Sequence, residues 1–186
     1  MSKESFEYRG VNHVALVCKD MKETVAFYTE VLEMPLVKTL DLPNGRGQHF
    51  FFDAGNGTTV AFFWFPDAPT VAPGIASQDP SPKTSFATAH ASMNHLALSI
   101  PLAKFDDYVE RLRSKGLPVH VINHADNAVG YTKGVTDETW IRSMYFQDPS
   151  GIALELAAYT REFTAQDVAH EPARYEDRER YIAMQN

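Results

Sequence analysis

The chain has 186 residues, of which 44% are hydrophobic and 22% are charged, and its formal net charge is −7. This composition indicates one globular domain with a real hydrophobic core, and the acidic balance excludes the basic surface that binds nucleic acid phosphates. Cys18 has no second cysteine for an internal disulfide, the first residues lack the apolar core of a signal peptide, and no apolar run could span a bilayer. We therefore expect a cytoplasmic protein whose partners are neither nucleic acid nor membrane.

A short sequence is repeated, and each copy predicts a strand that carries a histidine. Residues 10–16 read Gly-Val-Asn-His-Val-Ala-Leu and residues 92–98 read Ser-Met-Asn-His-Leu-Ala-Leu. His13 and His95 therefore stand at the same point of the repeat. Such self-similarity indicates the duplication of one supersecondary unit, so we expect two related halves.

The first half continues from its strand into a helix and then into further strands. Asp20 is placed to cap a helix that runs to about Met34, through apolar residues at helical spacing. Short aromatic and β-branched segments, separated by turns rich in asparagine and glycine, then predict three strands. These strands cover residues 35–42, 48–53 and 58–65.

The second half repeats this order of elements. Pro101 fits the first turn of a helix whose apolar stripe ends at Gly116. The strands predicted after it cover residues 117–124, 139–147 and 152–159. The predicted fold class is therefore α+β, with two βαβββ modules at residues 8–65 and 92–160.

Two segments lie outside these modules. The connector at residues 66–91 is long for a link inside a compact domain, and it is rich in proline, with Pro66, Pro69, Pro73, Pro80 and Pro82. We expect it to be a lid over a site or a strap to a partner. Residues 161–186 contain a charged stretch that predicts a peripheral helical arm. Because the connector and arm are longer than one domain requires, we expect a homodimer.

Strand alternation predicts a polar site with small neighbours. His13 shares its strand face with Ala15, and His95 and Glu155 also have alanine beside them on their faces, as in the wall of a cavity. Glu155 lies within an apolar strand, where an isolated charge is costly, so it needs a cation as a partner. Two histidines and one carboxylate form the arrangement that holds ferrous iron and other first-row divalent metals.

The other histidines lack a repeated counterpart, and we expect each of them to be structural or at the surface. They are His49, His90, His120, His124 and His170. His49 lies in an aromatic strand and is the best of them for a supporting role beside the metal.

On these residues, the chain resembles the vicinal oxygen chelate superfamily, the group of glyoxalases, bleomycin-resistance proteins and extradiol dioxygenases, over residues 8–160. The resemblance implies that two βαβββ modules form a cupped half-barrel around a divalent metal. It implies His13, His95 and Glu155 as the ligands and Fe(II) as the metal, with Mn, Zn or Ni as alternatives. The position of a fourth ligand is Ala61 here.

The apolar Ala61 argues against glyoxalase I and methylmalonyl-CoA epimerase, which the chain otherwise resembles but which use a fourth side-chain ligand. Residues 144–155 are similar to the latter half of the extradiol dioxygenase signature, which implies that Tyr145 is the active-site tyrosine. That signature also has a histidine shortly before the tyrosine, around residues 136–138, where this chain has none. His49 or His90 is the candidate for acid and base work.

The leading hypothesis is an Fe(II) ring-cleaving dioxygenase that acts on a small aromatic vicinal diol or an enolisable substrate, with Tyr145 and His49 as catalytic residues. A second hypothesis is a lyase, isomerase or transferase in which the metal acts only as a Lewis acid. A third is a module that binds a drug without turnover. Such modules generally lack the metal triad, so the triad counts against the third.

Overall fold

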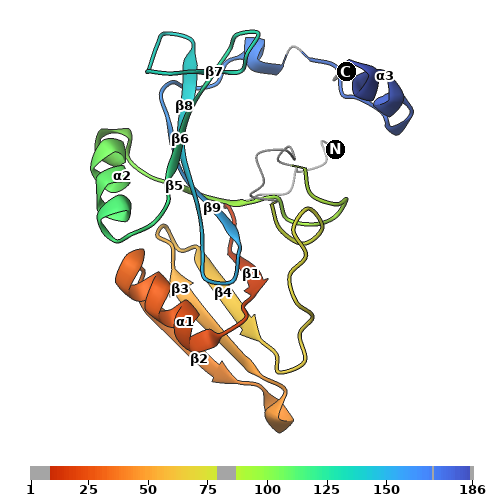
Figure 1. Ribbon diagram of the computed structural model, residues 1–186. Coiled ribbons are helices and arrows are strands. Elements are labelled where there is room, and N and C mark those ends of the chain that lie inside the picture. Colours follow the sequence, from red (N-terminus) through yellow and green to blue (C-terminus); the bar gives the residue numbers. More distant parts are fainter. Residues whose placement is uncertain (1–8, 79–86, 169, 185–186) are drawn as a thin grey trace, which may run out of the picture.

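The computed structural model of the protein describes residues 9–78, 87–168 and 170–184, and it has two β-sheets (Figure 1). The first sheet has the strand order β1-β4-β3-β2, with β1 parallel to β4 and the other neighbours antiparallel. Its strands are β1 (His13–Val17), β2 (Leu36–Asp41), β3 (Gln48–Asp53) and β4 (Thr59–Trp64). One helical segment follows β1, so this half is a βαβββ module.

The helical segment of the first module changes its hydrogen-bonding pattern halfway. Asp20 caps α1 (Met21–Ala26) by accepting a hydrogen bond from the Glu23 amide, and the chain then continues as the π-helical turn η1 (Phe27–Val31). Thr29 donates a hydrogen bond from its hydroxyl to the Val25 carbonyl, a side-chain contact of the kind that bends helices. The expected helix is therefore present, but its second half is wider than an α-helix.

The second sheet has the order β5-β9-β8-β6-β7, with β5 parallel to β9 and antiparallel pairing elsewhere. Its strands are β5 (Leu96–Ser99), β6 (His120–Ala125), β7 (Tyr131–Thr132), β8 (Thr139–Gln147) and β9 (Ala153–Tyr159). The short turn η3 (Leu102–Lys104) leads into α2 (Phe105–Ser114), which packs on one face of this sheet. The strand order of the first sheet is thus repeated, and the predicted α+β fold with two βαβββ modules is confirmed.

Some details differ from the sequence-based expectation. The repeated strands begin later than predicted, at His13 and at Leu96, so His95 lies immediately before β5. The small strand β7 was not expected, and it forms within the polar loop before β8 by pairing with β6. The turn η2 (Pro43–Gly45) joins β2 to β3, and Asn44 adopts a left-handed conformation there, as asparagine tolerates.

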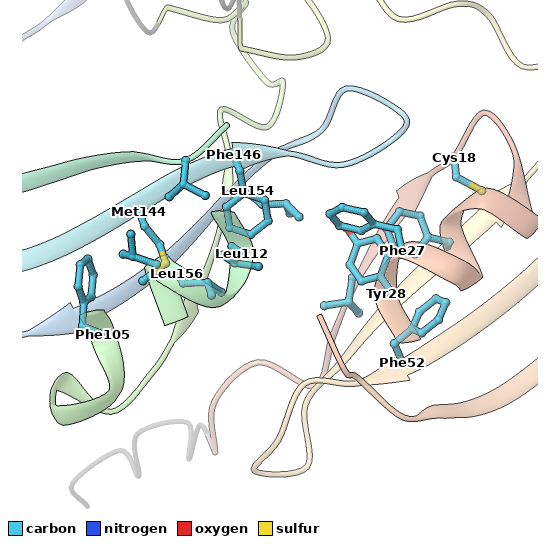
Figure 2. Close-up of a cluster of buried hydrophobic side chains, with 14 of the residues drawn as sticks. Cys18, Phe27, Tyr28, Phe52, Phe105, Leu112, Met144, Phe146, Leu154 and Leu156 are labelled. Carbon is cyan, nitrogen blue, oxygen red and sulfur yellow. The ribbon is translucent and has the colours of Figure 1, made fainter. Parts of the chain in front are cut away.

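One continuous hydrophobic cluster joins the helix-covered faces of both sheets (Figure 2). Tyr28 and Phe52 are fully buried in the first module, and Phe105 packs with Met144 and Leu156 in the second. The opposite face of each sheet carries no helix of its own module. We call this second surface the open face of each sheet.

Polar contacts also join the modules. The Lys19 amide donates a hydrogen bond to the Ser150 hydroxyl at 3.1 Å, and the Lys115 ammonium lies 2.9 Å from the Glu33 carboxylate. Both contacts link residues that are far apart in sequence, so the two modules pack as one body.

The connector and the arm are the least regular segments. Within the connector, Pro73 and Ser77 form an isolated β-bridge, whereas Pro80 and Pro82 lie outside the described residues. The arm contains η4 (Ala165–Val168), η5 (Tyr175–Asp177) and α3 (Arg178–Ala183), and Figure 1 shows α3 away from both sheets. Within the described ranges, no helix has both the length and the apolar character that crossing a membrane requires.

Candidate metal centre

Glu155 is held in the middle of the second sheet. Its strand, β9, lies between β5 and β8, where Glu155 pairs with Ala97 on one side and with Tyr145 on the other. Only 4% of Glu155 is exposed. Burial raises the pKa of this carboxyl group, but the causes that lower it, of which the contact with His95 is the largest, leave its pKa below the ordinary value.

His95 lies directly beside this carboxylate. The Nε2 atom of His95 is 2.8 Å from Oε2 of Glu155, and the Nδ1 atom is 2.7 Å from Oδ1 of Asn94. The amide oxygen of Asn94 accepts the Nδ1 proton, so in a neutral ring Nε2 presents a lone pair. Two acceptor atoms then face each other at hydrogen-bond distance, and a cation must lie between them. A proton or a metal ion satisfies this geometry.

The first module contains the same pair of residues. His13 Nδ1 lies 2.8 Å from Oδ1 of Asn12, which again leaves Nε2 available as a ligand atom. A hydrogen bond that fixes the second nitrogen of a metal-binding histidine is the usual way to orient its ring. The repeated asparagine therefore has a structural role: it selects the tautomer of each histidine.

The two modules do not bring their histidines together within this chain. Across the described residues, no group of three or more histidine, cysteine, aspartate or glutamate side chains is arranged to hold a metal ion. His95 and Glu155 are adjacent, whereas His13 is exposed on the first sheet with its ring 6.1 Å from that of Phe51. The donor set of the second module therefore fits a metal, but it is only part of a site.

His49 shares the open face of the first sheet with His13. Its ring stacks on Phe63 at 3.6 Å, and its Nδ1 atom is buried without a hydrogen-bond partner in the described part of the chain. Burial lowers the pKa of His49 and favours the neutral ring. Ala61 is fully buried on the same face and offers no ligand atom, while His90 is exposed in the connector.

Tyr145 lies beside the pair formed by His95 and Glu155. Its ring meets that of His95 edge-on at 5.8 Å, and its hydroxyl group is 3.1 Å from Nε2 of His124. Burial, with the nearby charge of Glu155, raises the pKa of Tyr145 to about 12, so the hydroxyl group stays protonated. His124 was expected to be structural or at the surface, but it lies next to the predicted active-site tyrosine, because β6 runs alongside β8.

Comparison with solved structures shows the same fold. A glyoxalase family protein from Enterococcus faecalis has a TM-score of 0.57 at 19% identity, with 81% of this chain and 98% of that chain covered. A glyoxalase/dioxygenase from Nostoc punctiforme has a TM-score of 0.54 at 24% identity, covering 86% and 100%. The fosfomycin resistance protein FosX from Listeria monocytogenes, complexed with Mn(II) and sulfate, has a TM-score of 0.52 at 19% identity, covering 83% and 95%.

Sequence comparisons identify the family. A curated relative, "Putative ring-cleaving dioxygenase MhqE" of Bacillus subtilis (strain 168), is 31% identical over 114 residues, which are 58% of this chain and 32% of that protein. The chain thus spans about a third of the length of this relative. The model of the Glyoxalase/Bleomycin resistance protein/Dioxygenase superfamily matches residues 10–156, which is most of the chain. The protein therefore belongs to this superfamily.

Proposed function

We propose that the protein is a metal-dependent enzyme, and that its activity is the Fe(II)-dependent ring cleavage of a small aromatic vicinal diol or a related enolisable substrate. The observation that carries this proposal is the contact between His95 Nε2 and Glu155 Oε2, with Asn94 holding the far side of the imidazole. A buried carboxylate that faces an imidazole lone pair is suited to a divalent cation.

His13 of a second copy of the chain supplies the third ligand. Strands β1 and β5 are each the edge of their sheet, so each can lie against another chain. Val17 on β1 is 49% exposed and Val11, just before it, is 60% exposed, which leaves apolar surface beside His13 for such contact. A two-fold pairing brings each His13 to the His95 and Glu155 of the other copy, and gives two equivalent sites.

Three protein ligands leave positions open for a bidentate substrate. The chemistry supplied by a bound ferrous ion would be the acidification of the substrate hydroxyl groups and the activation of dioxygen. Tyr145, whose raised pKa keeps its proton, donates a hydrogen bond to a substrate oxygen. His49 of the copy that supplies His13, an imidazole that burial keeps neutral on the open face of the first sheet, accepts a proton from the substrate.

The name of the B. subtilis relative supports ring cleavage. The alternative is a reaction in which the metal acts only as a Lewis acid, and the Mn(II) in the Listeria FosX structure is the observation that favours it. Both reactions use the same protein ligands, so the metal and the use of dioxygen separate them. A module that binds a drug without turnover is a third candidate, and the ligand pair counts against it.

The test is to purify the protein without oxygen, measure its metal, and load it with Fe(II). We expect a panel of catechols and hydroquinones to include a substrate whose addition, on admission of air, consumes oxygen and yields a ring-cleavage chromophore. Tyr145→Phe should slow this turnover about tenfold or more while the bound iron is unchanged. If the loaded protein consumes no oxygen with any diol or enolisable diketone, ring cleavage is excluded and the Lewis-acid reaction replaces it.

A further inference from the structure

His124 occupies a position beside the candidate site that the sequence did not predict. It lies on β6, opposite Ile141 of β8, and its side chain reaches along the sheet to Tyr145. Its ring is 6.0 Å from that of Trp140 and meets the Tyr145 ring edge-on at 6.3 Å. The imidazole is therefore confined by two aromatic neighbours and has its Nε2 atom on the Tyr145 hydroxyl group.

The direction of this hydrogen bond follows from the neighbours of Tyr145. A tyrosine hydroxyl group has one proton to donate, and an ionised carboxylate can only accept. Tyr145 and Glu155 are paired directly across β8 and β9, so the carboxylate lies beside the tyrosine as an acceptor for its proton, and burial together with this charge raises the pKa of Tyr145. With the tyrosine proton directed to Glu155, the Tyr145 oxygen is left to accept from Nε2 of His124, which lies 3.1 Å away. Burial lowers the pKa of His124, which favours the neutral ring, and a donated hydrogen bond to Tyr145 places the proton of that ring on Nε2.

We propose that His124 is a positioning residue, whose Nε2–H group holds the Tyr145 hydroxyl so that the tyrosine proton points across the open face toward Glu155 and a substrate oxygen bound there. This inference rests on the proposed function, because the substrate oxygen is the acceptor that gives the orientation its use. Residues 136–138, which precede the tyrosine strand, contain no histidine. His124, on the neighbouring strand β6, lies within hydrogen-bond distance of the Tyr145 hydroxyl group instead.

An orientation role makes a prediction that simple packing does not. If His124 only filled space between Trp140 and Tyr145, any ring of similar size would serve, and the side-chain donor would be irrelevant. If it holds the hydroxyl group, a side chain with an amide donor in the place of Nε2 should restore the effect. Substitution of His124 should also have no effect on substrate binding when Tyr145 has no hydroxyl group.

The first experiment reads the tautomer directly. Long-range ¹H–¹⁵N correlation spectra of the full chain without metal should show His124 as the neutral Nε2–H form, and Tyr145→Phe should change the Nε2 shift. A His124 ring that is protonated only on Nδ1 would overturn the proposal, because such a ring cannot donate to Tyr145. His120→Ala, on the same strand and exposed, assists assignment by removing one other imidazole.

The second experiment uses 4-nitrocatechol as the probe, added anaerobically to Fe(II)-loaded protein after the iron content has been measured. His124→Ala should weaken binding about tenfold, as the loss of one hydrogen bond predicts, and change the visible spectrum of the bound probe. His124→Gln should restore both, and His124→Ala should have no further effect in a Tyr145→Phe background. His170→Ala, at an exposed position of the arm, should alter neither.

Equal weakening by His124→Ala with and without the Tyr145 hydroxyl group would overturn the positioning role, while wild-type binding would remain as evidence for the proposed function. The positioning role would also be overturned if the His124→Ala variant bound 4-nitrocatechol as tightly as the wild-type protein does. If the wild-type protein itself binds iron but no nitrocatechol, the proposed function fails and the role of His124 falls with it.

Discussion

The hydroxyl group of Tyr28, on the helical segment of the first module, donates a hydrogen bond to Oδ2 of Asp148, in the turn between β8 and β9 of the second module, at 3.4 Å. Asp148 is 5% exposed, and its other oxygen accepts hydrogen bonds from the amides of Ser150 and Ile152. One buried carboxyl group therefore shapes the turn that precedes the Glu155 strand and ties that turn to the other module.

Asp148 should make the stability of the protein depend on pH. Burial raises the pKa of Asp148 in the folded state above its unfolded value, so its contribution is favourable at low pH and is lost as the pH rises through the folded pKa. Asp148→Asn keeps an accepting oxygen without the charge. From about pH 4 upward, the free energy of unfolding of the wild type should fall relative to that of this variant.

Urea unfolding between pH 4 and pH 7, an interval that begins at about the ordinary aspartate pKa and extends above it, measures this difference. Asp148→Ala is the control, since it removes the accepting atoms and should destabilise the fold by about 1–3 kcal/mol at every pH. A constant difference between wild type and Asp148→Asn across the range would contradict the assignment.

Glu155 and His95 should both be required for metal binding. Glu155→Gln or His95→Ala should lower bound metal at least about tenfold, whereas Glu110→Gln, an exposed change on α2, should leave it unchanged. Metal analysis after dialysis gives the result, with circular dichroism as the check on folding. Without metal, Glu155→Gln should be less stable than the wild type, because it breaks the contact with His95 that lowers the pKa of Glu155 in the folded state. Full metal content in both site variants would refute the assignment.

Asn94 should affect metal binding without being a ligand. Its oxygen fixes the Nδ1 proton of His95, and loss of such a supporting hydrogen bond typically lowers metal affinity 10- to 100-fold. Asn94→Ala should therefore weaken the metal within about that range, and the same change at Asn12 should act similarly through His13. Competition with a coloured chelator measures both affinities. Unchanged affinity in both variants would mean that the repeated asparagines have only a structural role.

Mixing two defective variants should rebuild a site if the ligands come from two copies. His13→Ala and Glu155→Gln chains each lack one ligand at every site of their own dimers. In a mixed dimer, the His13 of one chain meets the intact His95 and Glu155 of the other, so one of its two sites is complete. Unfolding and refolding the variants together should recover metal binding that neither has alone. No recovery, with mixed dimers shown by mass spectrometry, would exclude the shared site.

The arm should contribute to association. Its exposed apolar side chains include Tyr175 at 66%, Ile182 at 56% and Met184 at 75%, and Figure 1 shows α3 away from the sheets, so burial against another chain would stabilise it. Truncation after Val168 spares the contact of Phe163 with Trp140 and should weaken the dimer in analytical ultracentrifugation. The double variant Tyr175→Ser, Ile182→Ser should act in the same direction. An unaltered dissociation constant in both would assign the arm another role.

The sequence predicted the helices and strands because they depend on local patterns. The repeated Asn-His segment identified both edge strands. Glu155 within an apolar strand predicted a cation beside it, and the structure places His95 at 2.8 Å from its carboxylate. The position of His13 relative to this pair depends on how the modules pack through Tyr28 and Phe105, which no short-range pattern encodes. The meeting of His124 with Tyr145 depends on the β6–β8 register, which shifts next to His124.

The edge position of β1 and β5 has a thermodynamic consequence. If each metal ion is held by ligands from two chains, it binds only the assembled pair, and mass action then makes metal and association reciprocal. Adding metal should tighten the dimer by the same factor as dimer formation tightens the metal. A chelator would then act as a dissociating agent, and dilution alone would release the ion, so the protein would respond to its own concentration as well as to that of the metal.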